Sequence, residues 1–90
     1  MTGARFVVRG RVQGVGFRWF VWREAERLTL RGIVRNLRDG SVEVIAVGTE
    51  EGLEALERAL AQGPAMAEVE RVEKSAVPPE LAIPNGFDIR

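Results

Sequence analysis

The segment Gly10–Arg18, with the sequence GRVQGVGFR, contains residue types that could bind an anion. Its glycines let the backbone turn sharply and point several N–H groups into one concavity. A helix is predicted to begin at Phe17, and the first N–H groups of a helix are unpaired and lie at the positive end of its dipole. Arg18 falls in that first turn, where a cation is unfavourable unless an anion lies between it and the amides. Phosphate is the natural candidate, because the guanidinium fork can bind two of its oxygens.

The spacing alone leaves a second interpretation open, a tight strand-to-helix turn followed by a solvent-facing arginine. The segment is not a P-loop, because it has no Gly-Lys-Ser/Thr ending. It also lacks the Gly-x-Gly-x-x-Gly pattern of a dinucleotide-binding β-α-β unit.

The composition limits the chemistry that is available. The chain has no histidine and no cysteine, so catalysis must use arginine, amides, carboxylates and backbone groups. This excludes most hydrolase triads and argues against a zinc site. Thirteen basic and thirteen acidic residues cancel, so nucleic-acid binding is not indicated. No apolar run approaches the roughly 20 residues of a membrane span and no secretory signal is present, which favours a cytoplasmic protein.

The apolar pattern predicts a single domain over residues 1–90. The expected strands are Ala4–Gly10, Ile33–Leu37, Ser41–Val47, Val69–Val77 and a short fifth one at Phe87–Ile89. The expected helices are Phe17–Leu28 and a second one that is capped by Thr49 and ended by Gly63-Pro64. The order β-α-β-β-α-β predicts the α+β class, as a ferredoxin-like α/β sandwich with both helices on one face of an antiparallel sheet.

This order brings Asn36 to the glycine-rich turn. The strand that ends near Asn36 runs in the same direction as the first strand, so both end at one edge of the sheet. If the strand Ser41–Val47 lies between them, their backbones are about 10 Å apart, two interstrand spacings. Side chains from both sides can meet over that gap.

Two segments resemble the signatures of the acylphosphatase family. They are Gly10–Arg18 and Gly32–Val42, the latter with the sequence GIVRNLRDGSV and followed by Gly48. The resemblance covers essentially the whole chain, including the Phe-x-Ile-Arg ending. It implies an enzyme that hydrolyses acyl phosphates, in which Arg18 binds the phosphate and Asn36 orients the attacking water. The backbone amides expected to hold the phosphoryl oxygens are those of Gln13, Gly14, Val15, Gly16, Phe17 and Arg18.

Acyl-phosphate chemistry tolerates the missing histidine. The leaving group is a carboxylate, a weak base that needs no general acid. Phosphoryl transfer depends mainly on positioning and on stabilising charge at the equatorial oxygens. We therefore expect in-line attack by water with no metal, no cofactor and no covalent intermediate. Inorganic phosphate is the expected product and competitive inhibitor, the acyl group stays open, and a monomer with no nucleic-acid or membrane partner is expected.

Two positions depart from the family pattern. Ile33 stands where an aromatic residue is usual, and many members continue past the position of Arg90 with a tyrosine. Neither departure concerns Arg18 or Asn36, so both are expected to affect packing rather than activity.

Two other functions are compatible with parts of the sequence. RNA-recognition domains share the element order, but they stack bases on aromatic residues of the central strands, and Ser41–Val47 has none. A non-catalytic role would resemble the acylphosphatase-like domain of hydrogenase-maturation carbamoyltransferases. That domain leads a much longer chain, so a 90-residue protein favours the free-standing enzyme.

Some residues near the motifs have two interpretations. Trp19 and Trp22 could form an aromatic patch at the mouth of the site, but half-buried packing is favoured. Four arginines could add positive field or lie on solvated strand faces: Arg5, Arg9, Arg11 and Arg35. Glutamates of the second helix are interpreted as outer-face charge, and a mechanism based on paired carboxylates has no support.

Overall fold

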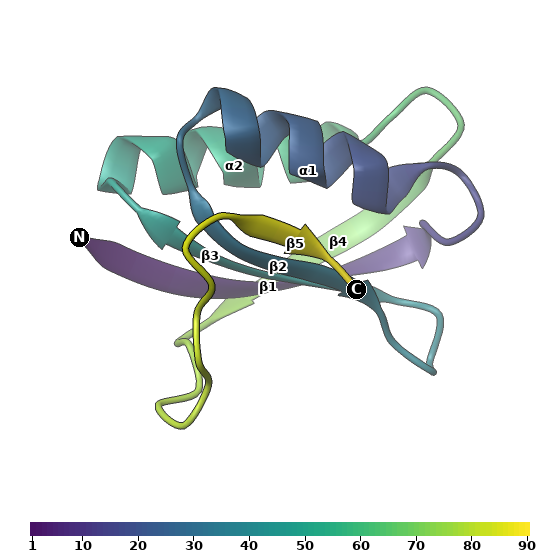
Figure 1. Ribbon diagram of the computed structural model, residues 1–90. Helices are drawn as coiled ribbons and strands as arrows, with labels where there is room; N and C mark the ends of the chain where they lie inside the picture. The colour runs from purple at the N-terminus through teal and green to yellow at the C-terminus, as the bar shows by residue number, and fades with distance from the viewer.

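The computed structural model describes all residues from 1 to 90 and contains five strands and two helices. The elements are β1 (Thr2–Arg11), α1 (Phe17–Arg27), β2 (Arg31–Asn36), β3 (Val42–Gly48), α2 (Glu50–Gln62), β4 (Glu68–Ser75) and β5 (Phe87–Ile89). The strands form one sheet in the order β4-β1-β3-β2-β5, and both helices cover the same face of it (Figure 1). The predicted α+β class and β-α-β-β-α-β order are confirmed, with boundaries shifted by one or two residues.

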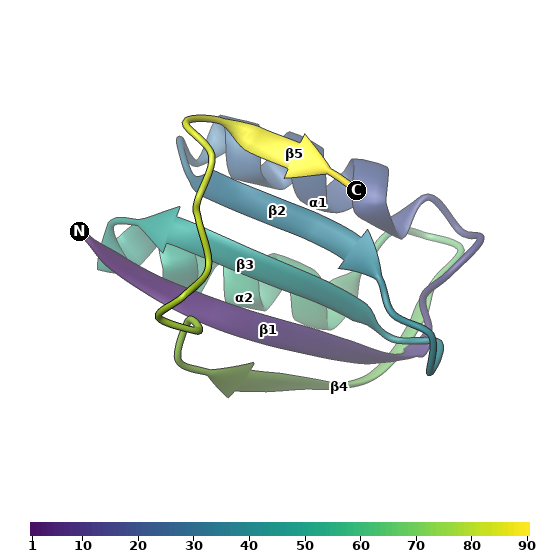
Figure 2. The ribbon, with the colours of Figure 1, turned by 60° about the horizontal axis from the view of Figure 1, so that its bottom comes forward.

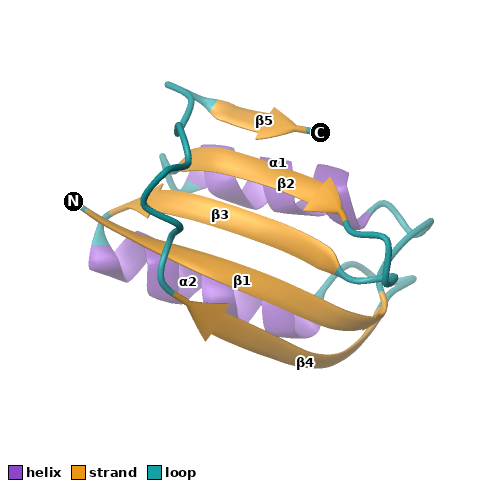
Figure 3. Cartoon of the chain, turned by 90° about the horizontal axis from the view of Figure 1, so that it is seen from below, coloured by secondary structure: helices purple, strands orange, loops and turns teal.

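The four main strands form the antiparallel sheet that was predicted, and the short fifth strand pairs parallel, which makes the whole sheet mixed. β1 pairs antiparallel with β3 and β4, and β2 pairs antiparallel with β3. β5 pairs parallel with β2, with Gly32 opposite Phe87 and Val34 opposite Ile89. The reason is the path of residues 76–86, which cross the face of the sheet opposite the helices (Figures 2 and 3). β4 ends at the end of the sheet where β2 begins. The chain that crosses the sheet there reaches the start of β2, and β5 then runs alongside β2 in the same direction.

The core lies between the sheet and the helices. Helix α1 contributes Phe17, Val21 and Ala25, and helix α2 contributes Leu53, Leu56 and Leu60. The strand residues that meet them alternate along each strand, and they include Phe6, Val8, Val34, Val42 and Val44. Burial of each large apolar side chain stabilises the fold by roughly 1.5–3 kcal/mol. The core therefore fixes α1 on the sheet, and with it the residues of its first turn.

The helix termini are capped in different ways. The Thr49 side chain accepts a hydrogen bond from the Gly52 N–H at 3.0 Å, and Gly63 follows α2 with a φ of 67°, as predicted. After α1, the N–H of Leu30 bonds to the Ala25 carbonyl and that of Thr29 to the Glu26 carbonyl. This is a Schellman motif in which Thr29 takes the left-handed position, with a φ of 58°, that glycine usually occupies. No helix of the chain is long and apolar enough to span a membrane.

Candidate active site

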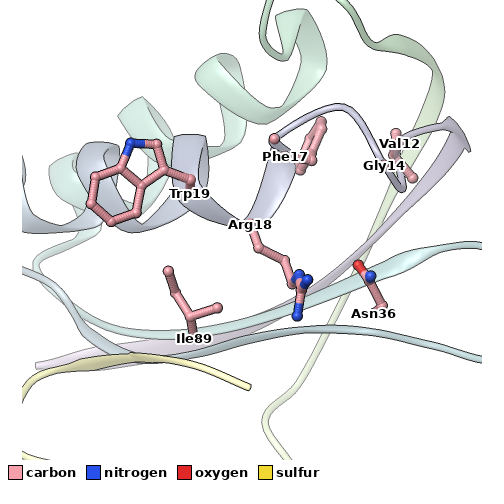
Figure 4. A pocket seen from close by; sticks show the side chains of 8 residues that line it. Val12, Gly14, Phe17, Arg18, Trp19, Asn36 and Ile89 are labelled. Carbon is pink, nitrogen blue, oxygen red and sulfur yellow. The ribbon is translucent and has the colours of Figure 1, made fainter.

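The turn between β1 and α1 and the end of β2 meet at one edge of the sheet. β3 lies between β1 and β2, and Asn36 is the last residue of β2. The turn and Asn36 share a cavity of about 210 Å³, shown in Figure 4. Its lining residues are Val12, Gly14, Gly16, Phe17, Arg18, Trp19, Asn36 and Ile89. The predicted meeting of Asn36 with the glycine-rich turn is confirmed as a matter of geometry.

The backbone of the turn leaves its N–H groups unpaired. Gly14 and Gly16 have φ angles of 75° and 77°, a left-handed conformation that L side chains adopt only with strain. No N–H group from Gln13 to Gly16 donates a hydrogen bond within the chain. Those of Phe17 and Arg18 belong to the first turn of α1 and have no intrahelical acceptor. The turn therefore offers a row of free donors at the positive end of a helix.

Arg18 reaches from α1 towards the strands, and its guanidinium is held by Arg90, the residue that follows β5. Its Nη1 donates a hydrogen bond to the backbone carbonyl oxygen of Arg90 at 2.8 Å. Arg90 is fixed in turn, because its own N–H donates to the carbonyl of Val34 in β2 at 2.8 Å. Arg18 forms no ion pair with an acidic side chain, and the bond to Arg90 uses one of its N–H groups, so most of its donors remain available to an anion.

The side chain of Asn36 is exposed and makes no hydrogen bond within the chain. Its backbone is held in register opposite Val42 of β3. In Figure 4 the amide of Asn36 and the guanidinium of Arg18 point towards one another across the cavity. A free amide on a rigid strand can hold a small polar molecule, such as water, beside whatever Arg18 binds.

The side chain of Gln13 ties the turn to the β2–β3 connection. Its Nε2 donates hydrogen bonds to the carbonyl oxygens of Leu37, at 2.8 Å, and Ser41, at 2.9 Å. Because Leu37 follows Asn36 directly, this amide links the loop to the residue opposite it in the cavity. Sequence reasoning assigned only the backbone of Gln13 to the site and missed this contact. No local signal could have found it, since the two acceptors are backbone atoms 24 and 28 residues away.

Four arginines of β1 and β2 form ion pairs with carboxylates. Arg5 and Arg35 both pair at 2.6 Å with Glu43, whose side chain is buried. Burial raises the pKa of Glu43, but the hydrogen bonds from Arg35 and Arg5 outweigh it and the pKa lies below its ordinary value. Arg9 pairs with Asp39 at 3.0 Å and Arg11 with Glu68 at 3.4 Å. All four arginines lie on strands and are at least partly exposed, which fits the strand-face interpretation, while their ion pairs were not predicted.

The two tryptophans differ in burial. Trp22 is partly buried and packs against the core, as expected. Trp19 is 55% exposed, which differs from the favoured interpretation of half-buried packing. It stacks on Trp22 with ring centroids 4.9 Å apart and planes inclined by 12°, and it lines the cavity beside Arg18.

No group of three or more metal-ligating side chains gathers anywhere in the chain.

Comparison with known proteins agrees with this architecture. A family model described as Acylphosphatase matches residues 4–89. An acylphosphatase of Nitratidesulfovibrio vulgaris is 51% identical over 91 residues, which cover all of this chain and 91% of the relative. The crystal structure of acylphosphatase from Bacillus subtilis superposes with a TM-score of 0.92 at 38% identity, covering 100% of this chain and 99% of that one. HypF from T. kodakarensis matches with a TM-score of 0.85 at 38% identity, but the match covers only 12% of its length.

The ferredoxin-like sheet, with the cavity that Arg18 and Asn36 line, thus occurs in a protein whose relatives are acylphosphatases. The chain belongs to the acylphosphatase family. Its activity is that of an acylphosphatase, the hydrolysis of acyl phosphates.

Proposed function

We propose that the chain hydrolyses acyl phosphates by in-line attack of a water molecule that Asn36 holds. The phosphoryl group is bound by the backbone amides from Gln13 to Arg18 and by the guanidinium of Arg18. The observation that carries the proposal is that three kinds of available donor line one cavity. They are backbone amides of the turn, among them those of Gly14 and Gly16, the N–H groups of Arg18 that do not bind Arg90, and the Asn36 amide.

The charge of the phosphoryl group is stabilised by groups that are already in place. The turn amides and Arg18 can contact its non-bridging oxygens, where charge is spread in the transition state. Arg18 is oriented by the Arg90 carbonyl before substrate arrives, so little side-chain freedom is lost on binding. A binding mode of this kind makes inorganic phosphate a competitive inhibitor.

The bond changes balance without a protein acid, a metal or a covalent intermediate. The oxygen of water bonds to phosphorus, and the bond from phosphorus to the carboxylate oxygen breaks. The carboxylate leaves as an anion, and the protons of water remain on the phosphate product or pass to solvent. Asn36 cannot act as a strong base, so its role is to aim the water.

Hydrolysis of benzoyl phosphate in ¹⁸O-labelled water with EDTA present tests this route. We expect full activity, with one ¹⁸O atom in phosphate and none in benzoate. Label in benzoate would mean that water attacks the carbonyl carbon, and loss of activity with EDTA would mean that a metal takes part. Either result would reject the proposed route.

A non-catalytic role, as in a domain of a longer protein, is separated by the same assay. The match to a small part of HypF motivates that alternative. A chain that binds phosphate but does not accelerate benzoyl phosphate hydrolysis would favour it over catalysis.

A further inference from the structure

Two of the exposed hydrophobic side chains lie at the mouth of the phosphate site. The chain has four large hydrophobic residues that are exposed, Met1, Trp19, Met66 and Ile89. Trp19 and Ile89 both line the cavity that contains Arg18 and Asn36, although one comes from α1 and the other from β5. Exposed apolar side chains that line a cavity beside a cation and an amide point to a ligand with an apolar part.

The indole of Trp19 contacts a side chain that packs against the core. It stacks on Trp22 at a centroid distance of 4.9 Å, and Trp22 packs against the core. Ile89 is fixed by the parallel pairing of β5 with β2, opposite Val34. The two side chains lie on the apolar side of the cavity, called here the Trp19–Ile89 wall.

The wall lies where the acyl group of a substrate would point. In-line attack requires water and leaving group on opposite sides of phosphorus. In Figure 4, Arg18 lies between Asn36 on one side and the Trp19–Ile89 wall on the other. With the phosphoryl group at Arg18 and the water at Asn36, the departing carboxylate extends towards the wall.

We infer that the Trp19–Ile89 wall binds the acyl group and makes the enzyme prefer acyl phosphates with aromatic or extended apolar acyl groups. This inference rests on the proposed function, because it uses Arg18 and Asn36 to orient the substrate. A phenyl ring can stack on or pack against the indole face, whereas a methyl group reaches little of it. The wall thus discriminates between substrates that share the same phosphoryl group.

The test compares kcat/KM for benzoyl phosphate and acetyl phosphate in the parent and in Trp19→Ala. The benzoyl-to-acetyl ratio should fall about fivefold in the variant, the size expected for the loss of one aromatic contact. Trp19→Phe, which keeps an aromatic face, should restore most of the ratio. Met66→Ala removes an equally exposed hydrophobic side chain away from the cavity and should leave the ratio unchanged. Ile89→Ala is the second variant, and it should lower the ratio in the same direction if Trp19→Ala fails to fold.

The inference is overturned if both substrates lose activity by the same factor, because Trp19 would then act on the phosphate site or on the fold. It is also overturned if the ratio is unchanged. A change in self-association measured by sedimentation would then show that the wall contacts a second copy of the chain. A different result would contradict the proposed function itself: Arg18→Ala would then hydrolyse both substrates at the parent rate.

Discussion

The guanidinium of Arg18 donates a hydrogen bond to the backbone carbonyl oxygen of Arg90, with 2.8 Å between Nη1 and the oxygen. A residue in the first turn of α1 is therefore oriented by the residue that follows β5. The parallel pairing of β5 with β2 places Arg90, and β2 also ends in Asn36. The paired strands β2 and β5 thus position both Arg18 and Asn36, the residues on which the proposed mechanism depends.

Asn36→Ala should lower kcat by about 100-fold and change KM by less than about threefold. The amide aims the water and gains its contacts in the transition state, so its loss affects the chemical step more than substrate binding. Steady-state kinetics with benzoyl phosphate measure both constants. Asn85→Ala is a matched control, because Asn85 is the other asparagine of the chain and lies in an exposed loop. A rise in KM with an unchanged kcat would make Asn36 a binding residue and contradict the water role.

Gln13→Ala should lower kcat about tenfold and weaken inhibition by inorganic phosphate, with the fold retained. The side chain holds the turn against Leu37 and Ser41, and small displacements between reacting groups are costly in rate. Gln13→Asn, whose amide is one methylene shorter, should recover part of the loss, which a purely structural defect would not predict. Gln62→Ala at the exposed end of α2 is the control. Parent kinetics in Gln13→Ala would show that the turn keeps its place without this tie.

The stability of the protein should fall as the pH is lowered from about 4 to about 2. Hydrogen bonds from the Ser41 hydroxyl, the Ser41 N–H and Arg9 lower the pKa of Asp39 from 3.8 to about 2. The unfolded chain therefore binds a proton at this carboxyl before the folded chain does, so the free energy of unfolding decreases as pH falls through this range. Glu43 adds to the effect in the same direction, because its pKa is also lowered.

Asp39→Asn should flatten this pH dependence and should be less stable than the parent at pH 7. Urea unfolding at a series of pH values measures both effects. Asp88→Asn changes the net charge by the same amount on the exposed strand β5 and serves as the control. If Asp39→Asn follows the parent curve from pH 5 to pH 2, the contacts with Ser41 and Arg9 do not stabilise the fold.

The elements that follow from local patterns could be predicted from the sequence. The apolar spacing of Phe17, Val21 and Ala25 identified α1, and Thr49 and Gly63 marked the limits of α2. The position of Asn36 next to the glycine-rich turn could be predicted from the order of the elements alone. Each of these features depends on residues that are close in sequence or on a general rule of topology.

The features that depend on distant backbone atoms could not be predicted. The bond from Arg18 to Arg90 spans 72 residues, and the direction of β5 depends on the path of residues 76–86 across the sheet. Thr29 gave no signal for its left-handed conformation, because β-branched residues rarely adopt it. The exposure of Trp19 was hidden by its helical spacing from Trp22, which suits a buried pair as well as an exposed stack.

The most direct test of the central claim is phosphate binding and benzoyl phosphate hydrolysis by Arg18→Ala with EDTA present. Arg23→Ala is the matched control, since Arg23 is exposed on the same helix and lies outside the cavity. We predict that Arg18→Ala stays folded by circular dichroism and loses at least 100-fold in kcat/KM along with most of its affinity for phosphate. The control should keep both properties. A folded Arg18→Ala protein that hydrolyses benzoyl phosphate at the parent rate would contradict the account.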